Sequence, residues 1–598
     1  MKNPQNLEMR SAKTGGRDLL RGHDMKYIYS RLWKYLSHRR LLFFMSIVLT
    51  VIAGMFSITG TSLAGKAIGA IAGEGEHNVF YYVLRMAIFY LLSAVITYVR
   101  AVIMMNLTQK MIAKMRSDVY DNLADLPVGY FDSKQAGEIV STISYDVNTV
   151  SETLATDFMQ IIMSAVTIVY SFVLMLTVSP ILVIVFVFTI PLSILITKII
   201  KSITRPLFRK RSIALGELNG YIEEMIAGHK TIKTYGREED VISEFNKKNE
   251  NATEAYRKAE ANGAMAGPSV MFVNNLSLAL VNIFGAILFI NTGITLTSLS
   301  QFVLLSRKFS GPINEIANIY ADIQSALAAA ERVVRLIDER REEPDPEGAP
   351  DLSCPHGKVE FKNVRFGYTE DKIILKNLSL TAEPGSVTAI VGPTGAGKTT
   401  IINLLMRFYD IDSGEILIDG ESIYDVKRQS LRSAYTMVLQ DTWLFNGTIF
   451  ENIAYGREDV TREQVEAVCR AAKIHNFVMS LPNGYDTVIS ESGTNISKGQ
   501  KQLLTIARAM LIDSKMLILD EATSNVDSKT ERDISDAMVR LMKNKTCFVI
   551  AHRLSTIREA DNVIVIKDGD AIEQGRHEEL LAKGGFYSEL YNSQFEKV

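Results

Sequence analysis

The sequence lacks the features of a disulfide-stapled domain, of a cysteine-based metal site and of a nucleic-acid-binding surface. It holds three cysteines in 598 residues, Cys354, Cys469 and Cys547, and no two of them have the spacing of metal ligands. So sparse and odd a set excludes a disulfide framework. The 65 Lys and Arg are balanced by 67 Asp and Glu, so no basic excess points to a nucleic acid as partner.

The start of the chain also lacks the pattern of a cleaved signal peptide. The first forty residues hold ten Lys and Arg against three acidic residues. No short apolar core with a small-residue cleavage site follows them. Residues 25–36, MKYIYSRLWKYL, mix aromatic and basic side chains at helical spacing, which is typical of a helix in the membrane interface. We expect residues 1–25 to form a cytoplasmic tail.

The sequence does have long apolar stretches, all in its first half. Six segments before residue 325 are candidates to cross about 30 Å of hydrocarbon, which takes about 20 helical residues. They are residues 41–64, 79–105, 157–178, 181–200, 267–290 and 296–318. The sixth is the weakest because Arg307 and Lys308 interrupt it, and a soluble helix is the alternative there. The apolar fraction of 47% fits a membrane part averaged with a soluble part.

Loop lengths and charges predict the orientation of these segments. The connections after the first, third and fifth are short, whereas those after the second and fourth are long and rich in Lys, Arg, Asp and Glu. Together with the basic N-terminus, this places the long loops in the cytoplasm. Both long loops have helical periodicity, so we expect helices that continue out of the membrane toward the soluble half.

A change of composition separates the two halves of the chain. Residues 339–357 are charged and then rich in proline, with four of the fourteen prolines between Pro344 and Pro355. This composition predicts an extended linker. We therefore expect a transmembrane domain over residues 26–338, a linker over 339–357 and a second domain over 358–598.

A glycine loop in the second domain predicts a site for a nucleotide and its magnesium ion. The pattern G-x-x-x-x-G-K-T covers residues 392–399, between the strand-like SVTAIVG and the helical IINLLMRFY. The loop N–H groups and the positive helix end would wrap the phosphates. Lys398 would bridge the β- and γ-phosphates of ATP, and Thr399 would bind Mg²⁺. The residues predicted to bind ATP here are Gly392, Pro393, Thr394, Gly395, Ala396, Gly397, Lys398, Thr399 and Thr400.

Two further strand-like runs end in residues of the types that ATP hydrolysis requires. KMLILDEAT ends in Asp520 and Glu521, at a strand end, where α/β sheets bind ligands. Asp520 is suited to hold Mg²⁺, and Glu521 to polarise the attacking water as general base. TCFVIAH brings His552 to the same predicted edge, as a candidate contact for the γ-phosphate.

These motifs resemble those of an ABC exporter of the half-transporter type, over nearly the whole chain from about residue 26. The resemblance implies a membrane bundle of six helices with long cytoplasmic extensions, fused to an α/β P-loop ATPase domain. It implies that Tyr368 in RFGY stacks on adenine. It also implies that Gln440 in VLQDTWLF binds Mg²⁺ and links the nucleotide to the membrane domain, and that Glu491 contacts the partner's long loops. SNVD, which ends in Asp527, matches the loop that crosses to the partner.

The resemblance also implies a dimer that sandwiches two ATP molecules, each held by one chain's phosphate loop and the other's signature segment. LPVGYFDSKQAGEIVSTISYDV and EEMIAGHKTIKTYGREE are similar to the two cytoplasmic loops whose tips act as coupling helices. Asp132 and Tyr235 lie in these loops. They are the residues in which we expect substitution to uncouple transport from hydrolysis.

The signature segment departs from the family pattern at one position. Where the family has L-S-G-G-Q, this chain has Ile496, Ser497, Lys498, Gly499 and Gln500. Lys498 would place a β-carbon and a long stem near a phosphate, or its ammonium would swing away to solvent. Because the chain's own Lys398, Asp520, Glu521 and His552 are all present, the pattern favours one subunit of a heterodimer, with a homodimer as the alternative.

The expected function is ATP-driven export of an amphipathic small molecule, lipid or peptide across a bacterial cytoplasmic membrane. The expected cofactors are ATP and Mg²⁺. The expected partners are a second half-transporter, the lipid bilayer and the small amphipathic substrate, with no nucleic acid. An ATP-gated channel or regulator on the same scaffold, which binds ATP without pumping, is the alternative function. We expect the N-terminus and the ATPase domain to face the cytoplasm.

Overall fold

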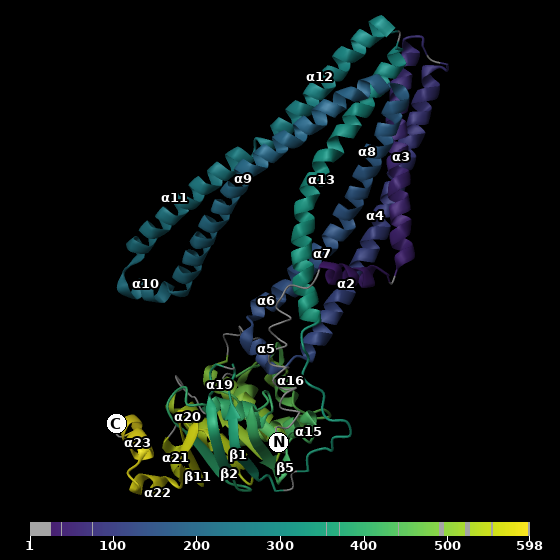
Figure 1. Ribbon diagram of the computed structural model, residues 1–598. Coiled ribbons are helices and arrows are strands. Elements are labelled where there is room, and N and C mark those ends of the chain that lie inside the picture. The colour runs from purple at the N-terminus through teal and green to yellow at the C-terminus, as the bar shows by residue number, and fades with distance from the viewer. Residues whose placement is uncertain are drawn as a thin grey trace, which may run out of the picture. The chain divides into compact units, whose positions relative to one another are not determined.

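The structure is a computed structural model whose chain divides into two compact units (Figure 1). Its described residues are 25–37, 39–74, 76–292, 294–353, 356–369, 371–440, 442–489, 496–512, 514–520, 527–551 and 554–595. Up to residue 124, and again over 136–339, they form one unit, called here the helical unit. Residues 125–135 and those from 340 onward form the other, called the α/β unit.

The helical unit is built from helices, the longest of which are much longer than a membrane is thick. They are α2 (Met25–Ser37), α3 (Arg40–Ile71), α4 (Val79–Ala124), α6 (Ala136–Ser141), α7 (Val147–Glu152), α8 (Phe158–Val178), α9 (Pro180–Ala227), α10 (His229–Tyr235), α11 (Glu238–Gly263), α12 (Ala266–Thr292) and α13 (Leu296–Ile337). At about 1.5 Å per residue, a helix as long as α4 or α9 extends about 70 Å. Such helices continue well beyond about 30 Å of hydrocarbon.

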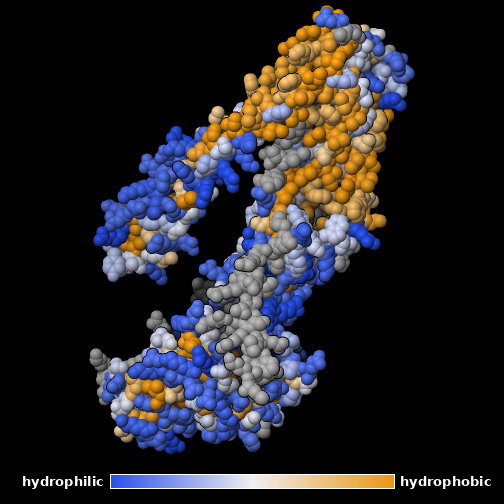
Figure 2. All heavy atoms as spheres, in the orientation of Figure 1, coloured by the Kyte–Doolittle hydropathy of each residue, from blue (hydrophilic) through white to orange (hydrophobic). Residues whose placement is uncertain are grey.

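Among the described residues, five helical stretches are long and apolar enough to cross a membrane. They are Arg40–Ile71, Val79–Ala124, Ala136–Val178, Pro180–Ala227 and Glu238–Asn291. The predicted sixth segment, in α13, is not among them, so the count of six remains a prediction. In Figure 2 hydrophobic side chains cover one end of the helical unit, and hydrophilic ones cover α10 and the adjoining ends of α9 and α11.

Small residues let α13 pack closely against α3. A β-carbon on Gly65 would lie 2.5 Å from the Cα atom of Gln301, so the two backbones approach as only glycine allows. The Gln301 side-chain amide donates to the Ser62 carbonyl at 3.1 Å. Further along α13, Phe302 and Phe309 are buried against Phe186 of α9. These contacts hold α13 within the bundle whatever the polarity of its sequence.

The α/β unit is built on two larger sheets. The six-stranded sheet has the order β12-β11-β3-β10-β9-β6, with parallel pairing from β11 to β6, and the four-stranded antiparallel sheet has the order β2-β1-β4-β5. Its strands are β1 (Val359–Phe366), β2 (Leu375–Ala382), β3 (Val387–Val391), β4 (Ser413–Ile418), β5 (Glu421–Ser422), β6 (Tyr435–Val438), β7 (Gly447–Thr448), β8 (Val488–Ile489), β9 (Met516–Asp520), β10 (Thr546–Ile550), β11 (Asn562–Lys567) and β12 (Asp570–Gly575).

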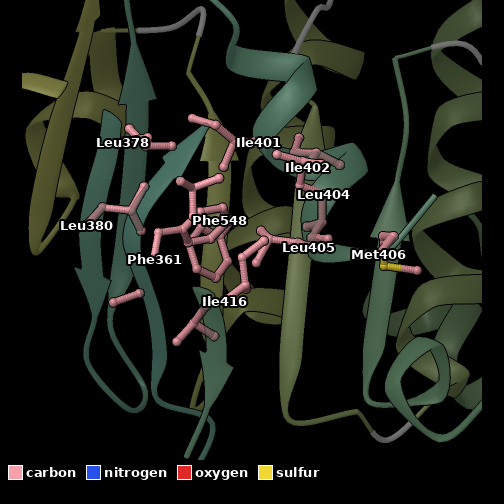
Figure 3. Close-up of a cluster of buried hydrophobic side chains, with 14 of the residues drawn as sticks. Phe361, Leu378, Leu380, Ile401, Ile402, Leu404, Leu405, Met406, Ile416 and Phe548 are labelled. Atoms are coloured by element: carbon pink, nitrogen blue, oxygen red, sulfur yellow. The ribbon is translucent and has the colours of Figure 1, made fainter. Parts of the chain in front are cut away.

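Helices cover these sheets and complete the α/β unit. They are α5 (Val128–Ser133), α14 (Lys398–Leu405), α15 (Arg428–Ser433), α16 (Ile449–Ala454), α17 (Arg462–Ala471), α18 (His475–Ser480), α19 (Lys498–Leu511), α20 (Ser528–Met542), α21 (Leu554–Glu559), α22 (His577–Ala582) and α23 (Phe586–Phe595). Figure 3 shows Phe361 of β1, Leu378 and Leu380 of β2 and Phe548 of β10 meeting Ile401 and its neighbours on α14. This buried cluster fixes the helix that follows the glycine loop.

The chain between α13 and β1 is anchored to the α/β unit without forming a helix or strand in its described part. The Arg432 guanidinium bonds both carboxylate oxygens of Glu342, at 2.5 and 3.1 Å. The backbone N–H of Arg428 donates to Asp345 at 3.0 Å. The described part of the predicted linker is therefore irregular, with a turn at Gly348, and is held against the α/β unit.

Candidate nucleotide site

The glycine loop joins β3 to α14 in a conformation that only glycine adopts readily. Gly392, Gly395 and Gly397 have φ angles of +155°, +83° and +106°. A side chain on Gly392 would collide with the carbonyl oxygen of Ile566. The loop ends at the N-terminus of α14, where the first backbone N–H groups have no partner within the helix. These backbone N–H groups can therefore donate hydrogen bonds to phosphate oxygens.

Lys398 is the first residue of α14 and lies over the loop. Its ammonium donates to the carbonyl oxygens of Gly392 at 2.7 Å and Pro393 at 3.1 Å. Burial lowers the pKa of Lys398, and the nearby Asp520 carboxylate opposes that shift. The two side chains that the sequence assigns to phosphate and to Mg²⁺ therefore lie close enough to interact.

The parallel sheet explains why these residues meet. Ile550 of β10 lies beside both Ile390 of β3 and Asp520 of β9, so the three strands end at one edge. Gln440, which is exposed, follows β6, the parallel neighbour of β9. Thus the glycine loop, Asp520 and Gln440 all follow strand ends on one edge of the sheet. Glu521, His552 and Glu491 lie outside the described residues.

The side chains at this edge fit Mg²⁺, which needs few protein ligands, better than a metal ion whose ligands all come from the protein. Thr399 offers an exposed hydroxyl and Asp520 a partly exposed carboxylate. Within the described ranges, no group of three or more His, Cys, Asp or Glu could hold a metal ion. Mg²⁺ commonly takes one or two carboxylates and completes its shell with water and substrate phosphates. Thr399 and Asp520 would hold it in this way.

Tyr368 is positioned as a half-exposed aromatic platform. Its side chain is 45% exposed, and its ring packs edge-to-face with Phe366 and Tyr409 at centroid distances of 5.0 and 4.9 Å. Its hydroxyl lies 3.2 Å from that of Thr400 and accepts from the Asn403 amide at 3.1 Å. A ring held by two perpendicular neighbours and half open to solvent can stack on a nucleotide base.

Tyr409 connects this platform to α5, which lies in the first long loop between membrane-spanning stretches. Its hydroxyl donates to the Asp132 carboxylate at 2.6 Å. A β-carbon on Gly129 would lie 2.7 Å from the Tyr409 ring, so α5 packs closely on it. Burial and the Asp132 carboxylate raise the pKa of Tyr409, which keeps its hydroxyl protonated as the donor. Sequence reasoning identified Asp132 and missed Tyr409.

The signature segment begins α19, and Ser497 is its N-cap. The Ser497 hydroxyl accepts from the Gln500 N–H at 3.3 Å, and the Gln500 side chain accepts from the Ser497 N–H at 2.9 Å. Lys498 occupies the first helical position with an exposed side chain, whereas Gly499 is buried. The helix start is therefore fixed by this pair of hydrogen bonds.

Asp527 has a clear local role as the N-cap of α20. Its Oδ1 atom accepts from the backbone N–H groups of Lys529 at 3.1 Å and Thr530 at 3.0 Å. These bonds, with Thr530 foremost, lower the pKa of Asp527. The other residues of SNVD, 524–526, lie outside the described residues.

Comparison with known proteins finds similarity along nearly the whole chain. Residues 43–313 match the family model of the ABC transporter transmembrane region, and residues 375–524 match that of the ABC transporter. The uncharacterized ABC transporter ATP-binding protein YfiC of Bacillus subtilis is 41% identical over 588 residues, covering 98% of this chain and 97% of its own. A fatty acid ABC transporter ATP-binding/permease protein of Mycobacterium bovis is 43% identical over 501 residues, 84% of this chain and 79% of its own.

A solved structure shares this architecture. A bacterial Atm1-family ABC exporter with ATP bound superposes with a TM-score of 0.75 at 29% sequence identity. The match covers 93% of this chain and 98% of that one. Similarity in sequence and in fold thus extends over both units.

Proposed function

Because the chain belongs to the ABC transporter family, as an exporter chain that carries both of its regions, we propose that it exports an amphipathic small molecule, lipid or peptide across the cytoplasmic membrane. The chain is an ATP-hydrolysing, multi-pass membrane transporter. The cargo class, the direction and the membrane are the proposal. One relative carries a name that refers to fatty acid, itself an amphipathic compound.

The hydrogen bond between Asp132 and Tyr409 is the observation that supports coupled transport. Asp132 belongs to the loop that joins two membrane-spanning stretches, and Tyr409 contacts the proposed adenine platform Tyr368. A nucleotide that stacks on Tyr368 would therefore contact the ring that packs against Tyr409, and Tyr409 bonds this loop. A channel or regulator on the same scaffold would use the same contact without accumulating cargo.

In the proposed ATP site, each residue keeps the role that the sequence predicts. Lys398 and the N–H groups of the glycine loop hold the phosphates, while Thr399 and Asp520 hold Mg²⁺. When bound, Mg²⁺ neutralises charge on the β- and γ-phosphates. Glu521 polarises the attacking water, and His552 contacts the γ-phosphate.

ABC exporters act as dimers, and we propose that the partner of this chain is a different half-transporter. Ser497, Lys498, Gly499 and Gln500 would then face the partner's ATP. The departure at Lys498 from the signature pattern supports two unequal sites. The ATP bound by this chain's own glycine loop would be completed by the partner's signature segment.

Transport into inside-out vesicles tests the proposed function. The full chain is reconstituted alone and together with a candidate partner half-transporter from the same organism, and uptake of amphipathic probes is followed with ATP or with a non-hydrolysable analogue. An exporter accumulates a probe above its external concentration only with ATP. Equilibration without accumulation would identify the channel alternative, and ATP hydrolysis without any probe movement would contradict export.

A further inference from the structure

A carboxylate on α13 is bound by two side chains of α8 at membrane depth. The Gln160 amide donates to Oε1 of Glu315 at 2.7 Å, and the Ser164 hydroxyl donates to Oε2 at 3.1 Å. Ser164 is buried, whereas Gln160 and Glu315 are partly exposed. Each carboxylate oxygen therefore has one neutral donor and room for another contact.

The depth of this cluster follows from the apolar part of its helix. The helical stretch runs from Ala136 to Val178, and its apolar part, from Phe158 to Val178, has 21 residues. That is about 31 Å at about 1.5 Å per residue, close to the hydrocarbon thickness of about 30 Å. Gln160 and Ser164 lie about 3 and 9 Å from the Phe158 end by the same rise per residue. That end is the cytoplasmic one in the predicted orientation. Glu315 thus lies in the cytoplasmic third of the hydrocarbon layer.

The cluster holds one acidic group and no basic one. Both donors are neutral, and in the described part of the chain no Lys, Arg or His forms an ion pair with Glu315. Acidic side chains are rare within membrane helices, where they commonly mark a path for substrate or ions. A cationic ligand would supply the counter-charge that the cluster lacks.

The two residues of α8 that precede Gln160 are apolar and pack against α3. Beside Gln160 on α8, the buried Met159 contacts the Thr50 hydroxyl, and Phe158 stacks on Phe43 of α3 at a centroid distance of 5.7 Å. Apolar and aromatic side chains can hold the body of a ligand, while a carboxylate held by two donors binds its charged end. The low dielectric strengthens that charge–charge attraction.

We propose that Glu315, held by Gln160 and Ser164, binds the positive charge of the transported substrate, which is an amphipathic organic cation. This inference rests on the proposed export function and narrows its cargo. Glu315 would repel the carboxylate of a fatty acid, so the preferred cargo of this chain differs in charge from the compound in the name of the Mycobacterium bovis relative.

Two probes of similar shape and different charge test the assignment. Tetraphenylphosphonium is the cation and triphenylphosphine oxide the neutral analogue, and the affinity of the full chain for each is measured in lipid nanodiscs. Glu315→Gln keeps the shape and the hydrogen-bonding capacity but removes the charge. It should weaken cation binding by at least about tenfold, which corresponds to about 1.4 kcal/mol, and leave the neutral probe within about twofold.

Matched variants separate charge from folding. Glu315→Asp keeps the charge and should bind the cation more tightly than Glu315→Gln. Glu250→Gln removes a carboxylate from the exposed face of α11 and should bind both probes as wild type. Unchanged cation binding in Glu315→Gln would overturn the proposal. An equal loss for both probes would also overturn it, by assigning Glu315 to helix packing.

Binding and transport readouts distinguish this proposal from the proposed function. If the chain does not export, no probe accumulates in vesicles with ATP, yet the charge-dependent difference in binding persists. If the chain exports but Glu315 does not bind the cation, accumulation continues with the same preference in wild type and Glu315→Gln. Loss of cation accumulation alone, with the neutral probe still transported, is the result expected when both proposals hold.

Discussion

Tyr368, the proposed adenine-stacking residue, is held in one orientation by its neighbours. Two aromatic rings pack perpendicular to its ring, and two polar side chains bind its hydroxyl. Little side-chain entropy then remains to be lost when a base stacks on it. We therefore expect the ring to contribute to ATP affinity by stacking, and the hydroxyl to contribute by holding the ring in its orientation.

Replacing Tyr368 should separate these two contributions. Tyr368→Ala should weaken ATP binding by about 1–3 kcal/mol, the range for base–aromatic stacking, with little loss of maximal hydrolysis rate. Tyr368→Phe keeps the ring and should retain most of the affinity. The measurement is the ATP concentration dependence of hydrolysis. An unchanged dependence in Tyr368→Ala would mean that the base is bound elsewhere.

Glu521 follows Asp520, the last residue of β9, and is the proposed general base. Glu521→Gln should keep ATP binding, trap a closed dimer and lower hydrolysis by about 10²–10⁴-fold, the usual effect of losing a positioned base. Hydrolysis by the purified complex and nucleotide retention after gel filtration measure the two effects. Turnover equal to wild type would show that another group activates the water.

At the scale of secondary-structure elements, the strand–loop–helix unit was predictable and the contact with α5 was not. Glycine spacing, a β-rich run and a helical run lie next to one another in sequence, so local chemistry defines the phosphate loop. Tyr409 and Asp132 are separated by 277 positions, and no local pattern reports a contact over that distance. The same reason explains why Arg428 and Arg432 were not predicted to anchor the linker.

The Asp132–Tyr409 bond gives a sharp test of coupling. Tyr409→Phe removes only the hydroxyl, and Asp132→Ala removes the acceptor, so both should lower transport more than ATP hydrolysis. Substitution of Tyr235, which ends α10 with an exposed side chain, should have the same effect through the second loop. The ratio of probe transported to ATP hydrolysed is the measurement.

A matched control is available in the same part of the chain. Tyr120 on α4 is 72% exposed, and Tyr120→Phe removes a tyrosine hydroxyl without touching the Tyr409 contact. It should leave the transport ratio unchanged. If Tyr409→Phe lowers transport and hydrolysis in proportion, or lowers neither, the bond does not couple the two activities.

At the scale of the whole chain, the two-region architecture could be predicted because each region has its own periodicity and composition. Family models match both regions, which confirms the fused architecture. The number of membrane helices was harder to predict. Arg307, Lys308 and Glu315 lower the hydropathy of α13, and its packing against α3, α8 and α9 places it in the bundle. Hydropathy alone therefore gives a weak signal for a helix that carries several charged residues.

Lys498 bears on how two whole chains work together. It is the first residue of α19, next to the buried Gly499, in a helix start that Ser497 and Gln500 already fix. Backbone N–H groups at a helix start stabilise transition-state charge only when they come within hydrogen-bond distance. We propose that the Lys498 side chain keeps these groups away from the partner's ATP, while its positive charge still attracts the triphosphate. The site completed by this signature should therefore retain ATP for long and hydrolyse it slowly.

Two substitutions distinguish the bulk of Lys498 from its charge. Lys498→Ala removes the ammonium and keeps the β-carbon, so it should shorten ATP residence without restoring hydrolysis at that site. Lys498→Gly removes both and should change residence more than it changes the total turnover of the pair, because the productive site uses the partner's signature. Residence is measured with labelled ATP in the purified complex. A homodimer of this chain that hydrolyses and transports as fast as the natural pair would contradict the heterodimer, because a signature with Lys498 would then complete two productive sites.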